Sequence, residues 1–424
     1  MKLLKNKEVK NASWLIAGKV VQMLLSLVVG VLSARYLGPG NYGLIHYGTA
    51  WVTFFVAFSN LGINSVIVKD FLDNPDEQGE ALGSAVVLRF ISSALSAVAV
   101  IGCVLLVNMG EPLTIAVVAL QSLGLIFNTL EIINYWFQAQ YKSKVTAIAT
   151  LIGYVASSAY KIILLILGKD VRWFAFATSV DYIVIAVVLW ISYKSNNGPK
   201  LKFSLSKSKS LLKLSYHYIL SSVMVTVYSQ TDKVMIKEML DETEVGYYST
   251  SHTICTMWVF VLAAIIDSMY PTILKLYSKD KEAFIKKNKQ LYAIVFYMSC
   301  VVSLFFVFFG DFAVRILYGD AYAPAGDILK IAAWFNAFSY LGVARNAWIV
   351  SEGKQKYLKF MYCGAAVVNI ILNFIFIPIM GASGAALASL ITQIFTSIIL
   401  PMCIKAMRPN AKMMLEAIIL KNVF

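Results

Sequence analysis

Charged residues are scarce in this sequence, and their scarcity excludes several classes of protein. They make up 14% of its 424 residues, whereas an ordinary soluble domain has about 25%. Hydrophobic residues make up 59% of the chain, and the mean hydropathy is +0.71. A soluble globular protein and a disordered chain are therefore excluded, and the composition indicates a polytopic membrane protein.

Cysteine is rare too, and the motifs of common enzymes are missing. The five cysteines lie in apolar stretches, and no CxxC or Cys/His spacing occurs. The sequence therefore gives no sign of a disulfide scaffold, a metal site or a redox centre. P-loop, GxSxG, HExxH and kinase signatures are absent as well. We expect neither an ATP-driven pump nor another enzyme, and no cofactor.

Apolar stretches long enough to cross a bilayer recur along the whole chain. A spanning helix needs about 20 mostly apolar residues, and twelve stretches meet this requirement. The first follows a basic segment but has no cleavage site of small residues, so we expect an uncleaved span rather than a signal peptide. The expected spans are 12–34, 42–66, 82–108, 113–137, 145–167, 172–193, 213–237, 247–272, 290–310, 326–350, 358–379 and 384–406.

Lysine and arginine are distributed unevenly between alternate loops. If the N-terminus lies in the cytoplasm, the inside segments contain 26 of the 37 Lys and Arg residues, and the outside loops contain 6. Positive residues concentrate on the cytoplasmic side of membrane proteins, so we predict that both termini are cytoplasmic. This distribution accounts for the net charge of +14, and we expect no nucleic acid as a partner.

The sequence repeats weakly between its two halves. LGPGNYG at 37–43 resembles LDETEVG at 240–246, and WFQAQYKSK at 136–144 resembles WIVSEGKQK at 348–356. Each pair takes the same place among six spans, which is typical of a parallel repeat about an axis along the membrane normal. We therefore predict an all-α fold in which twelve transmembrane helices form two six-helix lobes with a central cavity.

A polar loop rich in Lys and Ser separates the two halves and sets the predicted domain limits. We expect an N-terminal lobe at 1–195, a cytoplasmic Lys-rich linker at 196–212 and a C-terminal lobe at 213–406. The tail at 407–424 is too short to span a bilayer. We expect it to be cytoplasmic or to lie in the membrane interface as an amphipathic helix.

Basic side chains within the spans are the first candidate site residues. Burying a charge at the centre of a membrane helix costs about 2.5–3.5 kcal/mol on insertion scales, so such residues commonly mark a binding site or a pathway. The alternative near a span end, as for Lys19 and especially Arg345, is extension to the interface. A cavity lined mainly by Lys and Arg favours an anionic ligand such as a diphosphate. The candidates are Lys19, Arg89, Lys161, Lys233 and Arg345.

Two acidic residues have natural partners among these bases. Glu131 lies at a depth similar to that of Arg89, and the two are expected to form a structural pair. Asp181 lies near the midplane, with Lys161 as its natural partner. This second pair is expected either to bind the helices together or to line the cavity.

Two further acids complete the set of candidates. Asp232 belongs to a polar cluster at 228–233 in span seven, which we expect to face the cavity because so many polar groups rarely face lipid. Asp267 in span eight is expected to pair with a cation or to carry a proton. The four acids would balance the basic charges or couple an ion, and Na⁺ and H⁺ both remain candidates for that ion.

Four stretches of the chain form an ordered set of motifs. ARYLGPGNYG begins the first at Ala34, and TDKVMIKEMLDETEVGYYS begins the second at Thr231. LYGDAY at 317–322 and FIPIMGASGAALASLITQ at 376–393 follow in order. The sequence is thus similar to the Wzx-type O-antigen and polysaccharide repeat-unit flippases, in the polysaccharide biosynthesis family of the multidrug/oligosaccharidyl-lipid/polysaccharide exporter superfamily.

The resemblance implies a function and a place in the cell. It implies a flippase, and not an enzyme, that moves an undecaprenyl-diphosphate-linked oligosaccharide across the bacterial cytoplasmic (inner) membrane by alternating access, for O-antigen or capsule assembly. Arg35, Asp232 and Lys233 fall within the family motifs. The implied partners are the lipid-linked oligosaccharide, membrane lipids, a polysaccharide polymerase and a chain-length regulator.

Two other functions remain open at this point. A multidrug or small-solute cation antiporter of the same superfamily would have the same spans, but its transport would depend mainly on Asp181 or Asp267. A membrane-embedded polysaccharide polymerase is the second alternative, and its loss would change glycan chain length rather than translocation.

Overall fold

Helices account for almost the whole structure. The computed structural model describes residues 7–423, and it describes side chains for 22, 23, 25–220 and 222–423. Within these limits no strand occurs. This is the expected outcome for a membrane chain, because an α-helix satisfies its own backbone hydrogen bonds in lipid. The chain folds as two compact units that divide between Thr226 and Val227.

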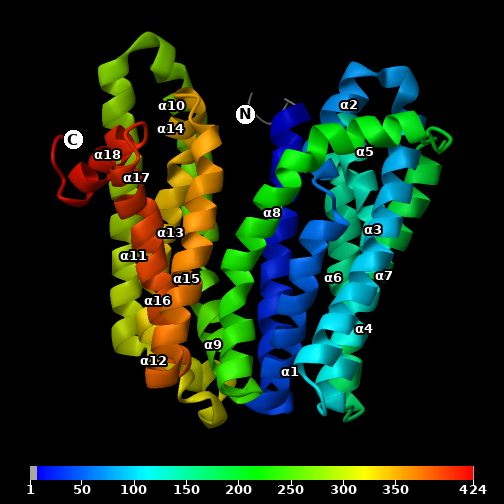
Figure 1. Cartoon of the computed structure of the whole chain (residues 1–424), viewed down its shortest axis with the longest axis horizontal. Helices are drawn as coiled ribbons and strands as arrows, with labels where there is room; N and C mark the ends of the chain where they lie inside the picture. The colour runs from blue at the N-terminus through cyan, green and yellow to red at the C-terminus, as the bar shows by residue number, and fades with distance from the viewer. Residues whose placement is uncertain (1–6, 424) are drawn as a thin grey trace. The chain divides into compact units, whose positions relative to one another are not determined.

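The first unit is a bundle of long helices (Figure 1). Its first helix is broken at Gly38, whose φ of 72° and ψ of 169° are not helical, and Pro39 follows directly. The break lies in the LGPGNYG segment, where a turn between spans one and two was expected. The helices are α1 (Lys7–Ser59), α2 (Ile67–Asp73), α3 (Gln78–Val107), α4 (Pro112–Asn128), η4 (Thr129–Ile132), α5 (Ile133–Ala139), α6 (Ser143–Ile166), α7 (Val171–Ser195) and the first part of α8 (Leu205–Met239).

The second unit begins within α8 and is also helical (Figure 1). Its first turn follows Leu240, and the Asp241 side chain accepts a hydrogen bond from the Glu244 amide at 2.9 Å, which caps the next helix. The helices are α9 (Glu242–Thr256), α10 (Phe260–Lys279), α11 (Lys281–Tyr318), α12 (Ala325–Ala332), α13 (Phe335–Ala344), α14 (Asn346–Ser351), α15 (Leu358–Met380), α16 (Ala382–Ile394), the π-helix η7 (Phe395–Ile399), α17 (Leu400–Cys403) and α18 (Arg408–Ile418).

Eight helical stretches of the described chain are long and apolar enough to cross a membrane. The other four predicted spans also fall on helices. They correspond to the two parts of α1, to α8, which contains several charged residues, and to the interrupted series α12–α14. The chain is therefore an all-α polytopic membrane protein, as its composition indicated.

Turn residues with positive φ recur in the same order in both units. The members of each pair are 209, 212 and 213 residues apart, so the spacing matches the offset between the two sequence halves. Such a backbone conformation is available mainly to glycine, and it ends a helix in each case. The pairs are Gly110 with Gly319, Tyr141 with Gly353, and Gly168 with Gly381.

One of these turns repeats down to its hydrogen bonds. The Lys142 amide donates to the Phe137 carbonyl at 2.8 Å, and the Lys354 amide donates to the Ile349 carbonyl at 2.9 Å. Both bonds close a helix end with a left-handed residue between their partners, as in common C-terminal caps. The WFQAQYKSK and WIVSEGKQK segments therefore adopt the same local structure, and the internal repeat is structural as well as sequential.

The polar segment between the halves is bound to the first unit. The Lys202 amide donates to the Gly79 carbonyl at 3.1 Å, and the Ser204 amide donates to the Ser84 hydroxyl at 3.0 Å. Lys207 pairs with Asp70 and Glu77, each at 3.0 Å. Hydrogen bonds and ion pairs therefore hold the segment predicted as a linker against α2 and the start of α3.

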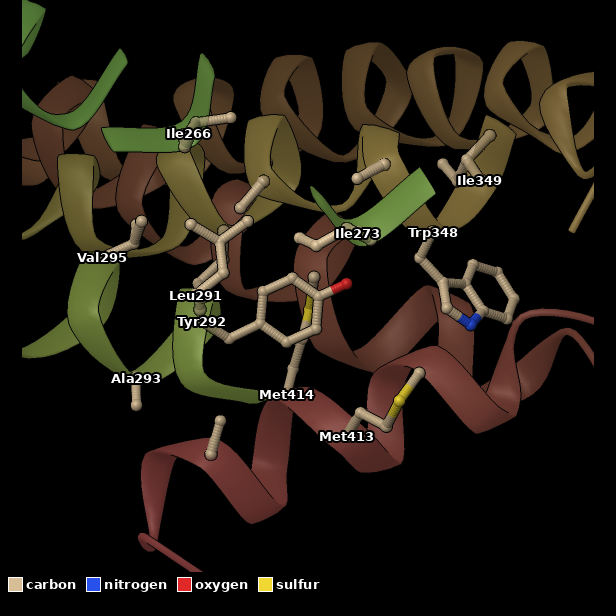
Figure 2. Close-up of a cluster of buried hydrophobic side chains, with 14 of the residues drawn as sticks. Ile266, Ile273, Leu291, Tyr292, Ala293, Val295, Trp348, Ile349, Met413 and Met414 are labelled. Carbon is tan, nitrogen blue, oxygen red and sulfur yellow. The ribbon is translucent and has the colours of Figure 1, made fainter. Parts of the chain in front are cut away.

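The C-terminal tail packs on the second unit. Met413 and Met414 of α18 lie against Leu291, Tyr292 and Trp348 in a buried cluster (Figure 2). Part of the apolar surface of this helix is therefore covered by protein, whereas Leu415, and Ile419 and Leu420 just beyond the helix end, are 39%, 69% and 47% exposed.

An ion pair holds the tail in place and gives a first prediction. Lys289 and Glu416 approach to 2.5 Å, and the hydrogen bond from Lys289 holds the pKa of Glu416 below its ordinary value. The pair's contribution to stability is present above the ordinary carboxyl pKa and is lost as the pH falls through the lowered value.

We expect Lys289→Ala to increase amide hydrogen exchange in α18, because the ion pair to Glu416 is lost. Lys286→Ala removes an exposed lysine of α11, the helix that also contains Lys289, and should leave the exchange in α18 unchanged. Equal exchange in both variants would show that the pair does not hold the tail.

Candidate functional site

A buried carboxylate organises the interior of the second unit. Asp232 on α8 is 4% exposed. It accepts hydrogen bonds from the Tyr248 hydroxyl and the Ser389 hydroxyl, each at 2.5 Å, and from the Asn373 amide at 2.7 Å. These donors come from α9, α16 and α15, so one side chain connects four helices. Both oxygens of the carboxylate therefore have hydrogen-bond donors.

Two asparagines on α15 extend this network. The Asn373 side chain also donates to the Asn369 amide oxygen at 3.2 Å, and Asn369 donates to the Ser389 hydroxyl at 3.3 Å. The two residues are four apart, so they lie on the same face of the helix. The Oδ1 atom of Asn373 is buried without a hydrogen-bond partner, which leaves one oxygen beside Asp232 free to accept a further donor or a cation.

Small residues bring these helices close enough for the network to form. A Cβ atom at Gly384 would lie 2.2 Å from the Phe376 carbonyl oxygen of α15, so only glycine permits this approach of α16. Ala385 and Ala386 are also buried in the same turn. The GASGAALAS segment therefore positions Ser389 against α15, as small residues do between membrane helices.

A cavity of about 140 Å³ adjoins the network. Asp232 and Lys233 both line it, and the Lys233 ammonium group donates to the Gln230 side chain at 3.1 Å. His252 of α9 and Phe335 of α13 also line the cavity. Five residues of the polar cluster at 228–233 thus line one part of this cavity, with an acid and a base on adjacent residues. Such a cavity can hold a small anionic group or a hydrated cation.

A second polar cluster lies in the first unit around Arg89. This side chain is fully buried. It donates to the Asn60 side chain, to the Asn64 side chain at 3.4 Å, and to the carbonyl and side chain of Asn128 at 3.1 and 2.9 Å. Asn128 in turn donates to Glu131 at 2.6 Å. Asn128 therefore links Arg89 to Glu131, and the charges of these two residues also interact.

Lys161 and Asp181 lie on the neighbouring helices α6 and α7. Their charges interact, but in the part of the chain that the structure describes no ion pair within 4.0 Å joins them. Asp181 lies beside Gly153, where an added Cβ would be 3.1 Å from its Oδ1 atom. That Oδ1 atom is buried without a hydrogen-bond partner.

Arg345 is held by an irregularity in the backbone. It is 3% exposed and donates through both terminal nitrogens to the Thr396 carbonyl, each at 3.3 Å. Thr396 lies in the π-helix η7, where the Leu400 amide donates to the Phe395 carbonyl. The residue five positions after Thr396 is Pro401, which has no amide N–H to donate to the Thr396 carbonyl. Arg345 therefore stabilises a helix distortion, and it does not extend to the interface.

The remaining candidates lie elsewhere. Arg35 and Asp267 are exposed on the surface of α1 and α10. Lys19 lies outside the residues whose side chains the structure describes. The structure therefore brings Asp232 and Lys233 together in one cavity, Arg89 and Glu131 in one network, and Lys161 and Asp181 near each other.

Uncharged polar residues are the part of these clusters that the sequence analysis missed. Asn369 and Asn373 contact the Asp232 network, and Asn60, Asn64 and Asn128 surround Arg89. Their spacing was a usable signal, because asparagines four residues apart in an apolar span share one face and need partners in the bundle.

These features agree with the comparison to known families. A sequence profile described as "Polysaccharide biosynthesis protein" matches residues 9–277, well over half of the chain. The chain belongs to this family. The match includes Asp232 and Lys233 and ends within α10, so the family assignment rests on the first unit and the start of the second.

Two relatives of the chain are named as a transporter and as a flippase. The chain is 22% identical over 296 residues to "Putative O-antigen transporter" of Shigella dysenteriae, which covers 69% of this chain and 74% of the relative. It is also 22% identical over 378 residues to "Probable low-salt glycan biosynthesis flippase Agl15" of Haloferax volcanii, with 84% and 75% covered.

Solved structures share the fold. The lipid II flippase MurJ in an inward closed conformation matches with a TM-score of 0.72 at 15% identity, covering 96% of this chain and 90% of that one. An inward-facing multidrug resistance MATE transporter of the MOP superfamily also reaches 0.72, at 14% identity, covering 93% and 96%. At 14% and 15% identity these structures show only that the chain shares their fold. The function of this polysaccharide biosynthesis protein has to be inferred from its site.

Proposed function

We propose that this protein is a flippase for an undecaprenyl-diphosphate-linked oligosaccharide repeat unit of a bacterial surface polysaccharide. The carrying observation is the cavity beside Asp232, in which Lys233 and His252 lie among apolar helices. A buried ammonium group offers a diphosphate a strong partner in a place of low dielectric. The family membership and the names of the relatives support the polysaccharide class of the substrate.

The internal repeat supports alternating access as the mechanism. Transporters built from repeats commonly move one repeat against the other around a binding site. In this proposal the sugars and diphosphate pass through the protein while the polyprenyl tail stays in the bilayer. The translocated unit then reaches a polysaccharide polymerase and a chain-length regulator. Both termini lie in the cytoplasm of this inner-membrane protein, as the excess of Lys and Arg in the inside segments supports.

Asp232 is the residue that we propose for ion coupling. Its carboxylate and the unpartnered Asn373 oxygen are adjacent, and two such oxygens suit either a bound Na⁺ or a proton shared with the carboxylate. Dependence of transport on the Na⁺ gradient at constant pH would assign the ion as Na⁺. Dependence on the pH gradient without Na⁺ would assign it as H⁺.

Complementation tests the function directly. In a strain without its own repeat-unit flippase, we expect this protein to restore surface polysaccharide, and Lys233→Gln to reduce the restored amount about ten-fold through loss of the charge-assisted contact. Lys275→Gln, which removes an exposed lysine of α10, is the matched control and should be neutral. Both variants are compared at equal protein level in the membrane.

Three results would contradict the proposal. Equal activity of Lys233→Gln and Lys275→Gln would remove Lys233 from the substrate path. Resistance to cationic drugs in cells that gain no surface polysaccharide would replace the flippase by a drug antiporter. A glycan of altered chain length with normal translocation would identify a polymerase.

A further inference from the structure

A second cavity lies at the end of the second unit that carries α18. Its volume is about 550 Å³. It is bounded by the first turn of α11, the end of α14, and the segment that runs from α17 into α18. Four lysines line it: Lys281, Lys354, Lys405 and Lys412. This cavity is separate from the one beside Asp232, since the two share no lining residue.

The charge of this lysine cavity is strongly positive. Among the described side chains, none of its four lysines has a carboxylate within ion-pair distance. Two carboxylates, Glu352 and Glu416, also line the cavity, but Glu416 pairs with Lys289 at 2.5 Å. Four ammonium groups therefore face one carboxylate that has no such pair, which favours an anion with more than one charge.

The walls of the cavity are fixed by the rest of the unit. The Asn410 side chain of α18 donates to the Tyr292 hydroxyl at 2.7 Å, and the Tyr297 hydroxyl donates to the Ile418 carbonyl at 2.7 Å. Together with the Lys289–Glu416 pair, these bonds attach α18 to α11. The lysines of α18 and its approach are thus held in register with Lys281, so the cavity exists before any ligand binds.

Apolar side chains form the inner surface of the lysine cavity. Phe284, Trp348 and Met413 are 2%, 3% and 7% exposed and belong to the same buried cluster. Figure 2 shows Trp348 and Met413 in this cluster. Ile285, which also lines the cavity, is 41% exposed. A ligand there would contact ammonium groups on one side and hydrocarbon on the other, which is the pattern presented by an ionic headgroup attached to an acyl chain.

We propose that this cavity binds the phosphate headgroup of an anionic phospholipid, most strongly one with two phosphates. Lysine clusters at the ends of membrane helices lie at the depth of lipid headgroups, and basic pockets between such helices recognise anionic lipids. The apolar wall and the exposed Ile285 favour a lipid over a soluble polyphosphate, because the soluble ion gains nothing from hydrocarbon contact. The site is independent of the proposed transport function.

Native mass spectrometry of the purified full-length protein tests this site. The probes are tetraoleoyl cardiolipin, dioleoyl phosphatidylglycerol, zwitterionic dioleoyl phosphatidylcholine and, separately, inorganic pyrophosphate. We expect the affinity for the two anionic lipids to fall about ten-fold or more in the triple variant Lys354→Gln, Lys405→Gln and Lys412→Gln. The matched control, Lys275→Gln, Lys279→Gln and Lys286→Gln, removes the same charge from exposed lysines of α10 and α11 outside the cavity and should change it less than about two-fold.

Each contrary result has a distinct meaning. Equal losses in both triple variants would overturn the site and leave diffuse surface charge as the cause. Unchanged binding in the cavity variant would overturn it as well. Selective binding of pyrophosphate without selective binding of anionic lipid would replace the lipid by a soluble anion. A triple Lys→Arg variant, which keeps the charge, should retain lipid binding and so separate charge loss from misfolding.

Discussion

Replacing Asp232 by Asn is expected to abolish transport while the protein still folds. Surface polysaccharide should fall by about 100-fold or more at unchanged protein level, since removing a buried hydrogen-bonded charge from a site can cost 2–5 kcal/mol of binding. The side chain keeps its shape, and the hydroxyl groups of Tyr248 and Ser389, which now donate to it, can rotate to accept from the new amide. What the variant loses is the negative charge beside Lys233.

The measurement is complementation together with a melting curve of the purified variant. Asp267→Asn is the matched control, because it removes one carboxylate from an exposed position on α10 and should leave transport nearly intact. Full activity of Asp232→Asn would show that Asp232 is not the coupling residue. Loss of activity with an equal loss of folded protein would reduce the role to structural support.

Replacing Arg89 by Met is expected to destabilise the first unit by about 3–5 kcal/mol. The loss leaves acceptors on Asn60, Asn64 and Asn128 without a donor inside a packed bundle, and each unsatisfied buried group costs about 1–3 kcal/mol. The amount of protein in the membrane should therefore fall sharply. The transport rate per remaining molecule should change little, because both terminal nitrogens of the guanidinium group already donate to asparagines of the same unit.

Two variants separate this structural role from substrate binding. Arg35→Met removes an exposed arginine of α1 and should not lower the melting temperature. Arg89→Lys keeps the charge but cannot reach several acceptors at once, so it should recover only part of the stability. If Arg89→Met instead accumulated normally and lost transport, the residue would belong to the substrate path, as its charge and depth in the membrane predicted.

The membrane architecture could be predicted from local features of the sequence. Lipid forces the backbone of each span to satisfy itself, so length and hydropathy were enough to locate helices at all twelve predicted spans. The repeat was also visible, because the turns at Tyr141 and Gly353 are set by short segments that carry their own hydrogen bonds. The cluster at 228–233 was located because many polar residues in one turn of a span must avoid lipid.

What the sequence by itself determined was therefore the spans, the repeat, the family and the placement of Asp232 and Lys233 in a polar interior. Only the tertiary structure decided which residues they meet: Asn373 and Ser389 lie 141 and 157 positions from Asp232 along the chain. It also decided that Arg345 serves a π-helix carbonyl and that α18 closes a lysine cavity. The physical reason is that hydropathy and helical period act over one span, whereas a buried polar group takes its role from the partners that packing of distant helices brings to it.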